Sequence, residues 1–71
     1  MASDERKKLR TLLKYWTTHN KEHIQEFREW ADGVTKLGEL ETAKWLEQAA
    51  QEMDKASEYL SHALTSLEKK G

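Results

Sequence analysis

Two histidines stand one helical turn apart in the first half of this sequence. His19 and His23 are four positions apart, so on an α-helix their side chains share one face, with Cβ atoms about 6 Å apart. Two imidazoles at this spacing can bind one divalent transition metal, such as nickel or zinc. The pattern has low specificity, because it arises in many helices. It also lacks the glutamate that follows the first histidine of zinc proteases, since that position is Asn20.

A complete metal site needs further ligands. The candidates are carboxylates and a phenol expected near the pair: Glu22, Glu26, Glu52 and Tyr59. The competing interpretation is purely structural. In it, His23 fills a seam between two helices, hydrogen-bonded to Asn20 or Ser57, while His19 flanks a small interface. The sequence leaves both interpretations open.

The elements that must position these residues follow from apolar spacing. Steps of four and three give one series at Leu9, Leu13, Trp16, Asn20, His23, Phe27, Trp30, Val34 and Leu37. Steps of three and four give a second at Ala43, Leu46, Ala50, Met53, Ser57, Leu60, Leu64 and Leu67. Both are heptad patterns, and no period-two alternation typical of strands is present. The sequence therefore predicts an all-α chain.

The connection between the two helices is predicted at Gly38, a residue that can take the left-handed conformation ending many helices. This gives one helical-hairpin domain over 1–71, with helices at about 4–36 and about 40–69 and a turn near 37–39. An alternative ends the first helix at Asp32-Gly33 and leaves a longer connection. In the antiparallel hairpin, Asn20 is expected to meet Ser57 as a polar layer that sets the register.

The second helix is apolar over a wider arc than a two-helix seam requires. Its flank of small residues, with two aromatic neighbours and a leucine of the first helix, forms the predicted interface: Leu12, Trp45, Ala49, Ala56, Tyr59 and Ala63. Covering this surface favours a homodimer, a four-helix bundle built from two hairpins. The alternative is a monomer in which Trp45 lies over the turn.

Composition excludes several classes of protein. The absence of cysteine removes disulfides, thiolate metal sites and cysteine nucleophiles. A net charge of −1 argues against general nucleic-acid binding. No apolar run approaches the roughly 20 residues of a membrane span, so we expect a soluble, cytoplasmic protein. No constellation of catalytic groups is recognisable, so we expect no enzymatic activity.

One stretch of the chain resembles a known kind of domain. Residues 13–23, LKYWTTHNKEH, followed by FREWA at 27–31, resemble a short helical domain of prokaryotic nickel-handling accessory proteins. That domain has an H-N-x-x-H element, F-R-x-W-A, a Leu-Gly turn and an alanine-rich second helix, and the resemblance covers roughly residues 10–67. It implies metal binding by His19 and His23. Related sequences carry further histidines near Tyr15 and Tyr59, so the resemblance implies that this chain keeps only part of a histidine cluster and has tyrosine in place of the rest.

Three functions follow, in decreasing order of support. The first is a non-enzymatic helical interaction module that self-associates or binds a protein partner through its apolar flank. The second is a metal-binding accessory domain using His19 and His23. The third is an anion-binding module using a basic end of the hairpin, made of Arg6, Lys7, Lys8, Arg10, Lys69 and Lys70.

Overall fold

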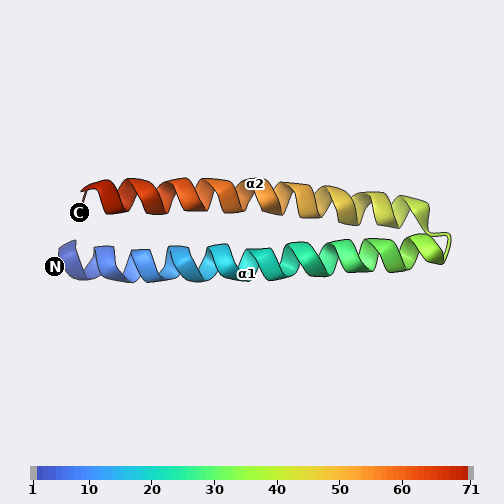
Figure 1. Cartoon of the computed structure of the whole chain (residues 1–71), viewed down its shortest axis with the longest axis horizontal. Coiled ribbons are helices and arrows are strands. Elements are labelled where there is room, and N and C mark those ends of the chain that lie inside the picture. Colours follow the sequence, from blue (N-terminus) through green and yellow to red (C-terminus); the bar gives the residue numbers. More distant parts are fainter. Residues whose placement is uncertain (1, 71) are drawn as a thin grey trace.

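Two long helices lie antiparallel and make up nearly the whole molecule (Figure 1). The computed structural model describes the backbone of residues 2–70 and the side chains of residues 4–69. Helix α1 spans Ala2–Lys36 and helix α2 spans Leu40–Lys70, with no strand among the described residues. The Cα atoms extend over 54 × 14 × 12 Å. The all-α, two-helix prediction is confirmed, and neither described helix is long and apolar enough to cross a membrane.

The turn between the helices is closed by backbone hydrogen bonds. Gly38 has a φ of 86°. Its N–H donates to the carbonyl of Thr35 at 3.0 Å, and the Glu39 N–H donates to that of Val34 at 2.9 Å. These two bonds are the pair that defines a Schellman motif. The Glu39 carbonyl then accepts from the Ala43 N–H at 3.0 Å and starts α2. Helix α1 passes through Gly33, which excludes the earlier end at Asp32-Gly33.

The seam of α2 is the predicted one. Its buried residues are Ala43, Ala50 and Ser57, and the other positions of the same heptad series are half-buried: Leu46, Met53, Leu60, Leu64 and Leu67. Alanines at alternate layers let the two helix axes approach closely, because little side-chain volume separates the backbones there. The small residues of α2 thus decide how much room α1 has in the seam.

The seam of α1 differs from the prediction at every second position. Buried or half-buried residues recur in steps of three and four at Arg10, Leu13, Thr17, Asn20, Ile24, Phe27, Ala31 and Val34. His19 and His23 are also half-buried, beside this series. This series shares Leu13, Asn20, Phe27 and Val34 with the predicted one. It takes Thr17, Ile24 and Ala31 where the prediction placed Trp16, His23 and Trp30. Ile24 is only 7 % exposed, although the sequence analysis did not place it in the core.

Side-chain volume explains the shift. An indole is too wide for the narrow space between two closely packed helices, whereas Ala31 and Thr17 fit there. The Thr17 hydroxyl donates to the Leu13 carbonyl at 2.8 Å, so its burial leaves no orphaned donor. As a result Trp16 and Trp30 lie beside the seam, and both are exposed.

Candidate functional site

The two long edges of the hairpin carry different side chains. We call one edge the apolar flank; it combines large residues of α1 with small ones of α2. Its members are Leu9, Trp16, His23 and Trp30 on α1, and Thr42, Ala49, Ala56 and Ala63 on α2, bordered by Leu12, Trp45 and Tyr59. Trp30 is 68 % exposed, Trp45 61 % and Tyr59 71 %. Every residue of the predicted interface is therefore exposed on one hairpin.

The opposite edge, which we call the charged flank, faces basic residues of α1 with mainly acidic residues of α2: Lys14, Lys21, Arg28, Glu47, Asp54, Ser61 and Glu68. The Arg28 Nε lies 4.0 Å from a carboxylate oxygen of Glu47. Lys21 and Asp54 line the same groove between the helices. Positions beside the seam face each other in an antiparallel pair, and opposite charges there favour this pairing of the helix edges.

The polar layer lies inside the seam. Ser57 is 5 % exposed and its Oγ has no hydrogen-bond partner within the described part of the chain. Asn20 is half-buried. A register-setting role for these two residues stays a prediction, supported by their position in the seam.

His19 and His23 point their Nε2 atoms at each other. The two Nε2 atoms are 2.9 Å apart, and the imidazole planes are nearly perpendicular, at 88°. On the other ring nitrogen, His23 Nδ1 lies 3.2 Å from Glu26 and His19 Nδ1 lies 3.9 Å from Glu22. Both imidazoles are partly exposed. Each histidine therefore has one nitrogen facing a carboxylate and one facing the other histidine.

Sequence reasoning missed that the pair belongs to a row of four rings. Tyr15 stacks on His19 with ring centroids 5.3 Å apart, and Phe27 stacks on His23 at 6.0 Å. The signal was present in the sequence, because Tyr15, His19, His23 and Phe27 recur every four residues. The flanking rings restrict the rotamers of both imidazoles.

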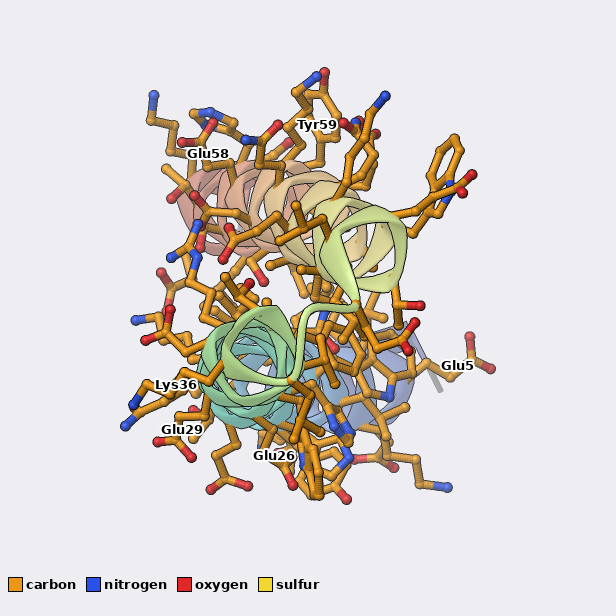
Figure 2. The ribbon with its side chains drawn as sticks, turned by 90° about the vertical axis from the view of Figure 1, so that its right-hand side faces the viewer. Glu5, Glu26, Glu29, Lys36, Glu58 and Tyr59 are labelled. Atoms are coloured by element: carbon orange, nitrogen blue, oxygen red, sulfur yellow. The ribbon has the colours of Figure 1, made fainter. Side chains whose placement is uncertain are left out.

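The other candidate ligands do not join the two Nε2 atoms. Glu22 and Glu26 face the Nδ1 atoms instead. Glu52 accepts from Gln48 at 3.1 Å and lies 3.6 Å from the Lys55 Nζ, both within α2. Tyr59 extends from α2 on the side away from α1, and Glu26 from α1 on the side away from α2 (Figure 2). Among the described residues, no group of three or more His, Asp or Glu could hold a metal ion.

The basic end of the hairpin lies where α1 begins and α2 ends (Figure 1). Lys7 and Lys8 are exposed and, with Thr11 and Leu12, line a shallow groove. The Arg10 Nε is buried and has no hydrogen-bond partner among the side chains and backbone that the structure describes. The side chain of Lys70 lies outside the described residues. An anion-binding role for this end stays a prediction.

Comparison with known proteins gives one match. The model of a domain of unknown function, DUF8180, matches residues 9–67, a range that includes most of both helices. This chain belongs to the DUF8180 family. A search of curated proteins found no match, and neither did a search of solved structures. Because DUF8180 has no assigned function, the resemblance to nickel-handling accessory proteins stays a prediction.

Proposed function

We propose that this chain is a non-enzymatic interaction module that self-associates through its apolar flank into a four-helix bundle. One observation carries the proposal. The largest apolar side chains, Trp16, Trp30 and Trp45, lie outside the seam and are 39 %, 68 % and 61 % exposed on one hairpin. Apolar side chains of this size normally become buried on association.

The exposed area supports a second copy as the occupant. The hairpin exposes 5681 Å², whereas a compact monomer of 8.3 kDa exposes about 4,600 Å². The excess, about 1,100 Å², is comparable to the roughly 800 Å² that each partner contributes to a standard interface. An elongated pair of helices becomes as compact as an ordinary domain once two copies stack side by side.

The apolar flank is also self-complementary. Its α1 row is large, with Trp16 and Trp30, and its α2 row is small, with Ala49, Ala56 and Ala63. A two-fold axis places the large row of one copy over the small row of the other, and the same contact then occurs twice. Large side chains seated over alanines give the dense packing that a stable interface requires.

The experiment that tests this proposal is Ala56→Glu with sedimentation equilibrium. The substitution puts two carboxylates into the interface of each dimer, which costs several kcal/mol. We expect the wild-type chain to sediment as a dimer of about twice 8.3 kDa, and the variant as a monomer at the same micromolar concentration. Ser61→Glu is the matched control, because it adds the same charge on the charged flank of the same helix.

Two outcomes contradict the proposal. In the first, the wild-type chain sediments as a monomer of 8.3 kDa at hundreds of micromolar, which shows that it does not self-associate. A dimer that survives Ala56→Glu but dissociates on Ser61→Glu uses the charged flank instead. None of these observations requires an enzymatic activity, and we propose no such activity for this chain.

A transition-metal-binding role is the second candidate function. The observation that favours it is the convergence of the two Nε2 atoms at 2.9 Å. Imidazole nitrogen is a preferred ligand of zinc, nickel and copper.

A further inference from the structure

We propose that His19 and His23 from two copies of the chain form one four-imidazole site for a divalent first-row transition metal at the centre of the dimer. This inference rests on the proposed self-association through the apolar flank. It adds a ligand class, a stoichiometry and a location, none of which follows from dimerisation alone.

The separation of the two Nε2 atoms suits a shared metal. Metal–imidazole bonds are about 2.0–2.1 Å long. With bonds of this length, two nitrogens 2.9 Å apart subtend an angle of about 90° at the ion. Neighbouring ligands of a square-planar or octahedral centre make this angle. An increase of about 0.4 Å in the separation would give the tetrahedral angle of zinc.

The carboxylate of Glu26 favours one tautomer of His23. Glu26 at 3.2 Å from His23 Nδ1 favours a proton on that nitrogen, which donates to the carboxylate and leaves a lone pair on Nε2. Glu22 lies 3.9 Å from His19 Nδ1, too far for a hydrogen bond, so the Nε2–H of His19 can donate to Nε2 of His23 at 2.9 Å. A metal ion bound by both Nε2 atoms would replace this shared proton. Carboxylate–histidine–metal chains with this order are the usual outer shell of metal sites.

One copy provides only half of such a site. His19 and His23 supply two ligands, and no third His, Asp or Glu converges on them in the described part of the chain. The missing ligands must therefore come from solvent or from another chain. His23 belongs to the apolar flank and His19 is one turn away on the same face, so the proposed dimer brings a second histidine pair to this surface.

The position of His19 and His23 along α1 brings the histidine pairs of two copies together in the proposed dimer. His19 is the middle residue of α1, with seventeen helical residues on each side. At 1.5 Å per residue, the centre of the pair lies about 3 Å from the midpoint of the helix. A two-fold axis parallel to the helices sets the large row of one copy over the small row of the other, and it places every residue level with its counterpart. The two histidine pairs of the proposed dimer are then at the same level, near the middle of the bundle.

Isothermal titration with Ni²⁺, Zn²⁺ and Co²⁺, each added alone to the full chain, tests the inference. We expect one ion bound per two chains at micromolar affinity or better, with protons released and the imidazole NMR resonances of His19 and His23 shifted. Sedimentation in parallel should show dimerisation at least tenfold stronger with metal than without it.

Three variants provide controls. His19→Ala should abolish metal binding while the metal-free dimer persists, because His19 is a proposed ligand but not a member of the apolar flank. Glu26→Gln should weaken binding about 10- to 100-fold through the His23 Nδ1 hydrogen bond, without changing the ligands. His62→Ala removes an exposed histidine of α2 and should leave the titration unchanged.

The outcomes separate this inference from the proposed function. A wild-type dimer whose imidazole resonances do not move at millimolar metal overturns the metal site and leaves self-association standing. One ion per chain, bound equally by wild type and by monomeric Ala56→Glu, overturns the sharing between copies. A wild-type chain that neither dimerises nor binds metal overturns both proposals.

Discussion

The charged flank and the apolar flank lie on opposite sides of one seam and are completed in different ways. On the charged flank, residues of α2 within the same chain complement those of α1, as at Arg28 and Glu47. On the apolar flank, Trp16 and Trp30 have only small residues of α2 beside them and stay exposed. One edge is therefore paired within the hairpin itself, whereas the other exposes apolar area, the surface through which we propose self-association.

The difference separates pairing within the chain from association between chains. Opposite charges on the charged flank favour the contact between these edges of α1 and α2, although each exposed ion pair adds little free energy of folding. Apolar area on the other edge supplies free energy only when water is removed from it. Changes on the two edges should therefore affect different measurements.

The largest effect on the free energy of unfolding should come from Ile24→Ala. Ile24 is buried in the seam next to the apolar flank, and its truncation should lower that free energy by about 2–4 kcal/mol. His23→Ala is the matched control at the adjacent position and should cost less than about 1 kcal/mol. Urea denaturation of both variants at one protein concentration measures the difference. If His23→Ala lowered the free energy of unfolding more than Ile24→Ala, His23 would lie in the seam and Ile24 beside it.

Trp30→Ala should act on association rather than on the hairpin. Its indole is mostly exposed in one copy and buried twice in each dimer, so we expect dimerisation to weaken by about 3 kcal/mol, roughly a hundred-fold in Kd. The helical circular dichroism of the dilute monomer should hardly change. Glu29→Ala is the control, because Glu29 extends from α1 away from α2 (Figure 2). An unchanged Kd for Trp30→Ala would mean that its indole lies outside the interface.

Arg28→Glu on the charged flank should have the smallest effect. Arg28 and Glu47 are each about half exposed, so we expect a loss of only 0.2–1 kcal/mol, roughly that of other surface ion pairs. The loss should shrink in 1 M salt, where the Debye length is about 3 Å. The double variant Arg28→Glu with Glu47→Arg should recover most of it. If the double variant recovers nothing, the two side chains do not interact in solution.

Much of the fold follows from local signals in the sequence. Helices predicted at about 4–36 and about 40–69 are observed at Ala2–Lys36 and Leu40–Lys70. The turn lies at Gly38 because its positive φ suits glycine. The spacing of His19 and His23 likewise placed both imidazoles on one face, since an α-helix fixes that geometry by itself.

The packing of α1 could not be predicted from spacing. The predicted and observed seams of α1 share four positions, and each alternates steps of three and four, so periodicity fits both. The large apolar side chains of Trp16 and Trp30 favoured the predicted seam over Thr17 and Ala31, whereas Ile24 is more apolar than His23 and favoured the observed one. The choice depends on the width of the gap opposite the alanines of α2, which is a property of two helices together.

The sequence by itself determined two helices, their turn and the shared face of His19 and His23, because each depends on residues close in the chain or on a repeat along one helix. Only the tertiary structure decided that Ile24 enters the seam, that the tryptophans lie beside it and that the two Nε2 atoms converge. Those features depend on side-chain volume and rotamer in a shared space, where one residue occupies room that another would need.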